Sequence, residues 1–337
     1  MSDMKFLVIG LGSMGKRRIR NLKAINFESI IGFDPREDRC KEASEKYSIK
    51  TFHDFEDAIN QNPNVMIIST PPDLHMKYAK IALKKNIHFF TEASVIQEDM
   101  KQIITELKNS DVVGIPSCTL RYHPIVQKIN EILLAGDIGK PLAFIHHFGQ
   151  YLPDWHPWED YKEFYVSKKE TGACREIVPF QLVWLISTFG KIKSVTARKS
   201  KLSNLDIEID DIYNILLKFE NGVEGILIVD VISRAPFLQA KIMTENGVIL
   251  ADWLDEKIKK FSKEKGWEIF DINAGSIEKE YIHGEGPYIE EMKNFVNIIN
   301  NKKLLTYSFE DDYEILKILN NIEKSCDYQS TQNLDTD

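Results

Sequence analysis

The chain has 337 residues, enough for two domains, and 43% of them are hydrophobic, which suffices for packed cores. Its formal net charge of -8 disfavours the broad basic face that binds nucleic acid, and no apolar run approaches the roughly 18 residues that span a bilayer. The four cysteines are widely spaced and form no disulfide or zinc pattern, and the first strand begins within a few residues, so we expect a cytoplasmic protein without a bound metal.

The chain begins with an apolar run over residues 5–9 that leads into the motif G-x-G-x-x-G, formed by Gly10, Gly12 and Gly15. Gly10 allows a tight turn, Gly12 lets the backbone approach a pyrophosphate, and Gly15 lets the next helix pack close to the strand. That helix, expected over residues 14–25, presents free N–H groups and a positive dipole end to the phosphates. This stretch predicts the start of a dinucleotide-binding domain.

A second apolar strand, over residues 30–33, ends at Asp34, about twenty residues beyond the glycine motif, where a carboxylate that binds ribose belongs. Such a carboxylate accepts hydrogen bonds from both ribose hydroxyls and repels a 2′-phosphate, which favours NAD. Arg36 follows closely, and a nearby arginine can reverse that preference. We therefore expect NAD or NADP as the cofactor, with a preference for NAD.

Strands and helices continue to alternate through this half, which predicts a parallel sheet covered by helices on both faces. Further strands are expected at 51–52, 65–70, 87–91 and 112–116. One further helix is expected to end near residue 47, and others are expected at 54–60, 73–85 and 97–108. Ligands bind beyond the carboxyl ends of such strands. Besides the three glycines, the residues expected to contact the cofactor are Ser13, Met14, Asp34, Arg36, Thr70, Pro71 and Glu92.

The pattern changes after residue 120. A helix at 125–135, a strand at 141–150, an irregular aromatic segment at 151–165 and a helix at 175–189 are expected. Strands then follow at 192–201, 211–219, 222–231, 237–244 and 247–253, with weaker runs through 272, before helices at 288–300 and 310–324. Asn221-Gly222 and Asn246-Gly247 are strong hairpin signals because both residue types tolerate positive φ.

These patterns predict an α/β N-terminal domain followed by an α+β C-terminal domain. We expect a Rossmann domain with a doubly wound parallel sheet at 1–120, and an α+β domain with an open, largely antiparallel sheet at 121–325. The polar tail at 326–337 is expected to be disordered.

One strand of the second sheet is apolar on both faces, because Ile226 and Ile228 alternate with Leu227 and Val229. One face should cover the helices of its own domain. The other is a candidate oligomer surface, since a large exposed apolar patch is unusual on a monomer. We expect a homodimer or homotetramer formed through this sheet.

Several motifs together resemble the Gfo/Idh/MocA family, named after glucose-fructose oxidoreductase and inositol 2-dehydrogenase. They are Gly10–Gly15, the turn Ser69–His75 (Ser-Thr-Pro-Pro-Asp-Leu-His), Arg121–Pro124 (Arg-Tyr-His-Pro) and Gly172 before a helix. The resemblance implies NAD(P)-dependent oxidation or reduction of a sugar, cyclitol or nucleotide sugar, and it implies that His75 lies near the nicotinamide. Residues 151–161 resemble a branch associated with bacterial surface sugars, where an arginine is usual at the position of His156.

The chain departs from this family at the two positions whose side chains usually transfer protons. The family's strand after the Thr-Pro turn usually ends in Glu-Lys-Pro, whose lysine lies beside the reacting hydroxyl, whereas this chain reads Glu92-Ala93-Ser94. A later family helix usually carries an Asp and a His, and here Pro179 or Phe180 stands in place of the histidine. Because Ala93 cannot move a proton, the family's usual pair cannot be carried over.

Three side chains are candidates for the missing proton donor or acceptor. His156 follows Asp154 and precedes Asp160, and either carboxylate could orient it and raise its pKa. His123 lies at the domain junction, where the alternative is a structural, hydrogen-bonded histidine. Tyr165 could act as a base near neutral pH only with a lowered pKa.

Polar and aromatic side chains of the second half are expected to hold the substrate. Arg175 and Glu176 could bind an anionic group and hydroxyls, and the alternative is an ion pair. His146 and His147 alternate on one strand, so they should face opposite sides and not form a joint site. The expected substrate-binding residues are Arg121, Tyr122, Trp155, Tyr161, Arg175, Glu176 and Gln181.

We expect an NAD(P)-dependent oxidoreductase of a sugar, amino sugar or nucleotide sugar, active in surface-carbohydrate metabolism, with a non-standard proton donor or acceptor. The alternative is a nucleotide-bound sensor or scaffold of the same fold that has lost turnover, which the missing lysine would permit. A third hypothesis uses the cofactor in a redox-assisted elimination or epimerisation. In each case we expect a small sugar-type ligand rather than nucleic acid or a membrane as partner.

Overall fold

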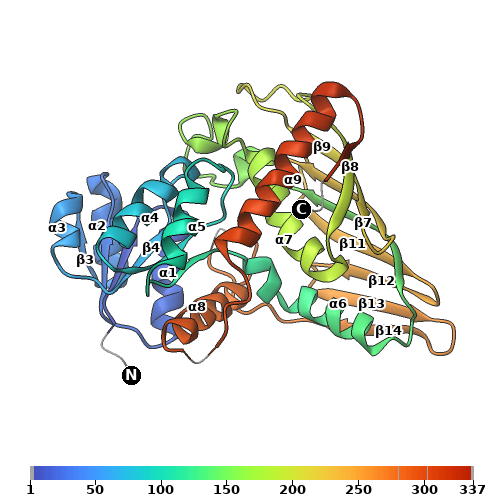
Figure 1. The fold of residues 1–337 in the computed structure, drawn as a ribbon, viewed down its shortest axis with the longest axis horizontal. Coiled ribbons are helices and arrows are strands. Elements are labelled where there is room, and N and C mark those ends of the chain that lie inside the picture. The colour runs from blue at the N-terminus through green and yellow to red at the C-terminus, as the bar shows by residue number, and fades with distance from the viewer. Residues whose placement is uncertain (1–3, 280, 302, 335–337) are drawn as a thin grey trace. The chain divides into compact units, whose positions relative to one another are not determined.

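A computed structural model describes residues 4–279, 281–301 and 303–334, and the chain divides into two compact units (Figure 1). The first unit comprises Met1–Thr119 and Tyr288–Glu314, and the second comprises Leu120–Pro287 and Ile315–Asp337. This division differs from the continuous one expected from the sequence, because the chain returns to the first unit at residue 288. Its apolar side chains there, among them Met292 and Phe295, belong to the core of that unit.

The first unit is built on a parallel sheet whose strand order is β3-β2-β1-β4-β5-β6. Its strands are β1 (Phe6–Ile9), β2 (Ile30–Phe33), β3 (Lys50–Phe52), β4 (Val65–Ile68), β5 (His88–Thr91) and β6 (Gly114–Pro116). The order reverses between β1 and β4, which lie side by side with Ile9 opposite Ile68. At such a switch point the carboxyl ends of the two strands leave a crevice in which ligands bind.

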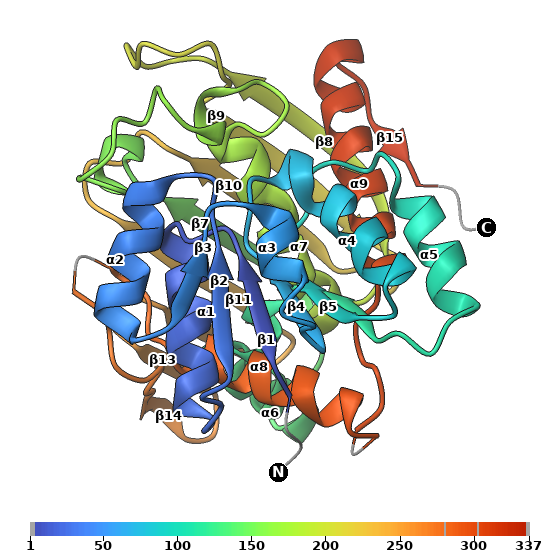
Figure 2. The ribbon, with the colours of Figure 1, turned by 90° about the vertical axis from the view of Figure 1, so that its left-hand side faces the viewer.

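Helices cover both faces of this sheet (Figure 2). One layer contains α1 (Ser13–Ala24), α2 (Glu37–Tyr47) and α8 (Gly286–Ile299), and the other contains α3 (Phe55–Ile59), α4 (His75–Lys84) and α5 (Met100–Lys108). In the first layer, Ile19 and Leu22 of α1 and Phe295 of α8 share one apolar cluster with Phe6 and Val8 of β1. The expected Rossmann domain is therefore confirmed.

The second unit is built on a nine-stranded sheet in the order β14-β13-β12-β11-β7-β10-β9-β8-β15. Its strands are β7 (Pro141–Gly149), β8 (Ile192–Ser200), β9 (Ile212–Phe219), β10 (Glu224–Asp230), β11 (Phe237–Thr244), β12 (Gly247–Asp252), β13 (Lys257–Ser262), β14 (Gly266–Asp271) and β15 (Gln332–Asn333). Strands β7 and β10 pair in parallel, and the other pairs of described strands are antiparallel. The two Asn-Gly turns join β9 to β10 and β11 to β12, as predicted.

Two helices, α6 (Pro124–Ala135) and α7 (Ala173–Phe189), pack against one face of this sheet. Phe189 of α7 stacks on Phe144 of β7 with ring centroids 4.7 Å apart, and Trp184 of the same helix is fully buried. Short helical turns η2 (Thr119–Tyr122), η3 (Leu152–Asp154) and η4 (Tyr165–Ser167) precede α7.

The expectation of disorder in the tail is wrong for residues 326–334. Helix α9 (Phe309–Tyr328) continues past the expected end, and Gln332 and Asn333 pair with Val195 and Ser194 of β8. The buried hydroxyl of Ser325 anchors this segment, since it accepts a hydrogen bond from Ala197 N at 2.9 Å and donates one to Ser330 O at 2.6 Å. Residues 335–337 lie outside the described part of the chain.

Among the described residues, no helix is long and apolar enough to cross a bilayer, and no group of three or more His, Cys, Asp and Glu side chains is arranged to hold a metal ion. All four cysteines are free thiols.

Candidate functional site

The glycine motif forms a tight turn between β1 and α1 in which two positions require glycine. Gly10 has φ of +87°, and a Cβ on it would lie 2.5 Å from Ser69 O. A Cβ on Gly15 would lie 1.7 Å from Gly10 O, so the helix could not approach the strand. On Gly12, in contrast, a Cβ would meet only the Arg39 side chain, at 3.4 Å. The turn is thus closed at its base and open above Gly12, as a pyrophosphate site requires.

The first turn of α1 is suited to an anion. Gly12 is its N-cap residue and supplies no side-chain cap, and the first turn contains no acidic residue. The N–H groups around Ser13 and Met14 therefore keep the partial positive charge of a helix N-terminus. This geometry fits the expected contact of Ser13 and Met14 with a dinucleotide.

Asp34 is fixed at the end of β2, beside the glycine turn. Its side chain is buried, with Oδ2 accepting from Leu11 N at 2.8 Å and Oδ1 accepting from Arg36 N at 2.9 Å. The guanidinium of Arg36 instead pairs with Asp38 at 2.6 Å, and its hydrogen bond holds the pKa of Asp38 down at about 2. The arginine side chain near the carboxylate is that of Arg39, whose Nη1 lies 3.8 Å from Asp34 Oδ2. Arg39 was not among the residues expected to contact the cofactor, although it lies one turn beyond Arg36.

Glu92, which follows β5, is held by a buried arginine. Arg18 of α1 donates from Nε to Glu92 Oε1 at 2.8 Å and from Nη2 to Glu92 Oε2 at 2.7 Å. Ser69 donates its hydroxyl to the same Oε1 at 2.9 Å. Both oxygens of the Glu92 carboxylate therefore have hydrogen-bond partners within the protein. Its contact with the cofactor remains a prediction.

The same arginine also contacts Glu291 of α8, with Nη1 2.9 Å from Oε2. Glu291 accepts further hydrogen bonds from Cys118 N at 2.6 Å and from the Thr119 hydroxyl at 2.7 Å. Burial raises the pKa of Glu291, and the charge of Arg18 opposes that rise. Burial alone would lower the pKa of Arg18, but Glu92 and Glu291 raise it, so the guanidinium stays charged. Nothing in the sequence distinguished Arg18 from its basic neighbours.

Two polar groups after β4 lack partners among the described residues. His75 is buried, its Nε2 donates to Thr70 O at 2.9 Å, and its Nδ1 has no partner there. The hydroxyl of Thr70 is likewise buried without a partner. Burial lowers the pKa of His75, so the neutral ring presents Nδ1 as an acceptor. Unsatisfied groups beside the Pro71 turn, next to Gly10, are what a bound dinucleotide would satisfy.

The end of β5 carries no group that can take a proton at position 93. Ala93 is half-buried, and Ser94, which follows it, is buried. Burial raises the pKa of Asp312 to about 6, while Tyr307 donates its hydroxyl to that carboxylate at 2.8 Å.

In the second unit, His156 lies in the aromatic segment on a turn. Its ring stacks on that of Trp158 with centroids 5.2 Å apart, and its Nδ1 lies 4.0 Å from Glu159 Oε2. Glu159 is therefore a further carboxylate near His156, besides the expected Asp154 and Asp160. The turn accounts for this, since Glu159 N donates to His156 O at 3.0 Å.

Tyr165 and Glu176 come together, since the phenol donates to Glu176 Oε1 at 3.0 Å. Arg175 pairs with Glu323 of α9 in a two-pronged contact, at 2.8 and 3.2 Å, and donates to Glu170 O at 2.7 Å. The ion-pair alternative for Arg175 is thus the one found, with a partner on another helix of the same unit.

His123 forms the hydrogen bond of the structural alternative. Its Nδ1 accepts from Ile125 N at 3.3 Å and so caps α6. Burial and the neighbouring His283 lower the pKa of His123 to about 3, so the ring is neutral near pH 7. A base this weak holds a proton poorly at neutral pH, which disfavours His123 as the proton acceptor.

The histidines on β7 face opposite sides of the sheet, as predicted. His146 is fully buried, with Nε2 2.8 Å from Oε1 of Gln181, which also accepts from Trp184 Nε1 at 3.3 Å. His147 lies on the other face, with Nε2 2.6 Å from Asp230 Oδ2. Gln181 is thus buried among core side chains, although sequence analysis assigned it to the substrate.

The remaining expected substrate residues are half-buried. Trp155 donates its Nε1 to Gln150 O at 3.3 Å. The side chains with this intermediate exposure are Arg121, Tyr122, Trp155 and Tyr161.

Both halves of the sequence match models of one protein family. The model described as the oxidoreductase family, NAD-binding Rossmann fold (GFO_IDH_MocA), matches residues 4–115. The model described as the GFO/IDH/MocA C-terminal domain matches residues 126–250. The expectation of an NAD-binding Rossmann domain is confirmed by the first match.

A curated relative is the myo-inositol 2-dehydrogenase of Thermotoga maritima, which is 29% identical over 143 residues. These residues are 41% of this chain and 43% of that protein, so the match spans less than half of the relative.

Solved structures of similar fold cover nearly all of the chain. An oxidoreductase from Agrobacterium radiobacter, in complex with NAD+, L-tartaric acid and magnesium, has a TM-score of 0.86 at 16% identity and covers 98% of both chains. Levoglucosan dehydrogenase in complex with NADH has a TM-score of 0.85 at 19% identity, over 98% of this chain and 99% of its own. The WlbA dehydrogenase from Bordetella pertussis, in complex with NADH and UDP-GlcNAcA, has a TM-score of 0.79 at 16% identity, with 100% coverage of both. At these identities the similarity shows the fold alone.

Proposed function

We infer the function of this chain from its family, since it belongs to the Gfo/Idh/MocA oxidoreductases through both of its halves. We propose that it is an NAD(P)-dependent oxidoreductase acting on a sugar, amino sugar or nucleotide sugar. The relatives support this substrate class, because they include a myo-inositol dehydrogenase, a levoglucosan dehydrogenase and a dehydrogenase solved with UDP-GlcNAcA. Surface-carbohydrate metabolism is the setting we propose for it.

The observation that carries the proposal is the cradle between β1 and α1. The turn is open above Gly12, the first turn of α1 is free of acidic residues, and Asp34 is fixed beside them. These groups would hold the pyrophosphate and the adenosine ribose of the dinucleotide, and Thr70 and His75 would satisfy polar groups on it. When bound, the dinucleotide supplies the hydride acceptor or donor.

We propose NAD rather than NADP as the preferred cofactor. Both oxygens of Asp34 accept backbone N–H groups, which fixes the carboxylate at a place where it would repel a 2′-phosphate. Arg39, at 3.8 Å, is placed to lessen this preference rather than to abolish it.

We propose His156 as the group that takes the hydroxyl proton. Its ring is partly exposed, and the Glu159 carboxylate at 4.0 Å is placed to orient it. Tyr165 is a poorer base because its hydroxyl donates a hydrogen bond to Glu176. The carboxylate of Glu176 disfavours a second negative charge on the Tyr165 oxygen. His123 would remain neutral and act as a hydrogen-bond donor.

We propose that the chain forms a dimer or tetramer through the open face of its second sheet. Leu227 and Val229 are fully buried, whereas Ile226 is 37%, Ile145 43% and Leu216 54% exposed. These three side chains occupy adjacent positions on β10, β7 and β9. A continuous apolar row of this kind supports burial against a second copy of the sheet.

The test is turnover by the purified chain. It should form NADH from NAD+ in the presence of at least one member of a panel of cyclitols, anhydrosugars and nucleotide sugars, and Asp34→Ala should raise the KM for NAD+. The sensor hypothesis is favoured by the absence of a titrating group at Ala93. Tight NADH binding with no turnover of any panel member in either direction would support that alternative.

A further inference from the structure

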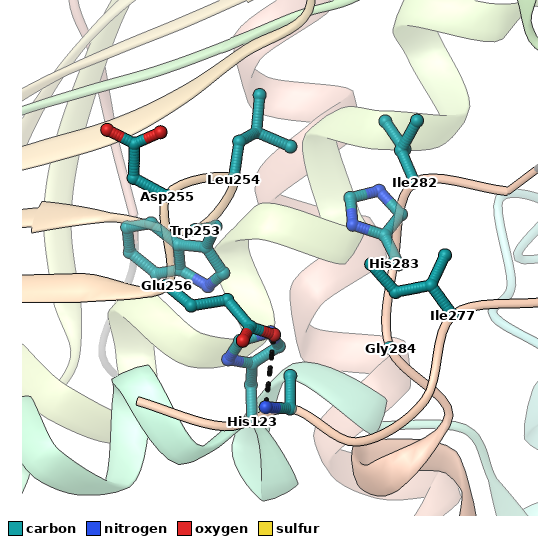
Figure 3. Close-up of a pocket in the computed structure, with 10 residues that line it drawn as sticks. His123, Trp253, Leu254, Asp255, Glu256, Ile277, Ile282, His283 and Gly284 are labelled. Carbon is teal, nitrogen blue, oxygen red and sulfur yellow. Dashed lines mark hydrogen bonds between the residues drawn. The ribbon is translucent and has the colours of Figure 1, made fainter. Parts of the chain in front are cut away.

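The second unit contains a small cavity outside the residues assigned above to the substrate (Figure 3). It lies between the turn after β12, from Trp253 to Glu256, and the loop before α8, which contributes Ile277, Ile282 and His283. His123, at the start of α6, closes one side. Its volume is about 180 Å³, or roughly that of six water molecules at about 30 Å³ each. A single six-membered ring with its hydroxyls is of this size.

Trp253 offers the cavity a donor that has no hydrogen-bond partner in the described part of the chain. The residue is only 4% exposed, and its Nε1 is buried without a hydrogen-bond partner among the described residues. An indole N–H is a donor only, so it requires an oxygen or another acceptor. Figure 3 shows this nitrogen on the ring edge that faces His123, and the two ring centroids lie 6.2 Å apart.

His123 offers a second donor on the same side. Because its Nδ1 accepts from Ile125 N and its ring is neutral, the hydrogen of the ring is on Nε2. Two neutral N–H groups therefore border one cavity, and both call for acceptor oxygens.

The rest of the lining selects against anions. The apolar walls are formed by Leu254, Ile277 and Ile282, and the charged lining residues are the acids Asp255 and Glu256. Glu256 is oriented by its hydrogen bond from Ala274 N, at 3.1 Å. No lysine or arginine is among the described residues that line the cavity. A phosphate or carboxylate would thus meet the Glu256 carboxylate and no lysine or arginine of the described lining, while the exposed Asp255 adds a like charge nearby.

We propose that this cavity binds one uncharged, hydroxyl-bearing ring of the substrate, a cyclitol or pyranose, with ring oxygens accepting from Trp253 Nε1 and His123 Nε2. The acid pair Asp255 and Glu256 then excludes rings that carry a carboxylate. This inference rests on the proposed function for its substrate class, but it concerns binding alone.

The test measures binding to the full chain by calorimetry, with and without saturating NAD+. The probes are myo-inositol and levoglucosan as uncharged rings and D-glucuronate as a charged one. Trp253→Phe removes the N–H and keeps an aromatic ring, and Trp267→Phe, at an exposed position of β14, is the matched control. We expect at least one uncharged ring to bind, about tenfold more weakly to Trp253→Phe and unchanged to Trp267→Phe.

D-Glucuronate should bind poorly to the wild type and more tightly to Asp255→Asn. Asp255 is exposed, so this change should not disturb folding. Failure of both uncharged rings to bind, or equal binding by Trp253→Phe and wild type, would overturn the proposal. Turnover of a sugar with an unaltered KM in Trp253→Phe would reject this cavity and leave the proposed function standing. If ring binding depends on Trp253 but the chain never forms NADH, the proposed function is rejected and the proposal for this cavity stands.

Discussion

Arg18 and Glu92 form a two-pronged ion pair inside the first unit, with N–O distances of 2.8 and 2.7 Å. The pair joins the helix after the glycine turn to the end of β5, and Glu291 adds a link from α8. The segment at 288–314 therefore completes the polar network beside the cofactor cradle as well as the apolar core.

Replacing Arg18 with Met should strongly destabilise the chain, because the buried Glu291 and the half-buried Glu92 would lose their shared cation. Removal of one partner of a buried pair costs about 3–5 kcal/mol. Urea denaturation followed by circular dichroism measures this loss. The matched control is Arg36→Met, which breaks an exposed pair with Asp38 and should change stability little. Similar midpoints for the two variants would contradict the role assigned to Arg18.

The proposed proton acceptor is tested by a pair of variants in the aromatic segment. His156→Gln should lower kcat by about a hundredfold or more and leave NADH affinity unchanged, because general base catalysis contributes that much. Tyr165→Phe should lower kcat less than about tenfold, since the Tyr165 hydroxyl already donates a hydrogen bond to Glu176. A full pH profile should lose its acidic limb in His156→Gln. The reverse order of the two effects would move the role to Tyr165.

Asp312 should make stability depend on pH below neutrality. Burial raises its pKa to about 6, above the unfolded value of 3.8, so the folded state binds the extra proton between these values. Stability should then fall as the pH rises through this window, by up to about 3 kcal/mol. Asp312→Asn should remove this decline in thermal melts between pH 4 and 7. A decline that persists unchanged in the variant would show that another group causes it.

The exposed apolar face of the second sheet predicts an oligomer. One charged side chain introduced on that face should dissociate it. Ile226→Lys places a cation among exposed apolar side chains and should convert the assembly to monomers in light scattering. Leu134→Lys is the control, since Leu134 is 86% exposed but lies on α6, away from the sheet face. A wild type that is already monomeric at micromolar concentration would rule out this interface.

The parts of the fold and site that depend on local pattern were predictable. The glycine turn, Asp34 and the two Asn-Gly hairpins follow from residue types at short spacing, because backbone sterics and strand periodicity determine them. Helix α7 was expected at 175–189, and the structure begins it at Ala173 and keeps Pro179 inside it.

The parts that depend on long-range contacts could not be predicted. Arg18 meets Glu291 only because α8 returns to the first unit, and no spacing rule anticipates that pairing. Likewise, the turn that brings Glu159 to the ring of His156 was not expected from the sequence. The tail was expected to be disordered from its polarity, but the anchoring hydrogen bonds of Ser325 cannot be read from composition.

The central claim is that the glycine turn and Asp34 hold the adenosine end of a nicotinamide dinucleotide. Calorimetric titration of the purified chain with NAD+, NADH, NADP+ and NADPH tests it most directly. We predict one-to-one binding that favours the NAD forms, with about tenfold weaker NADH binding and a smaller difference between NADH and NADPH in Asp34→Asn. Absence of heat with all four dinucleotides, in a chain that is folded, would contradict the account.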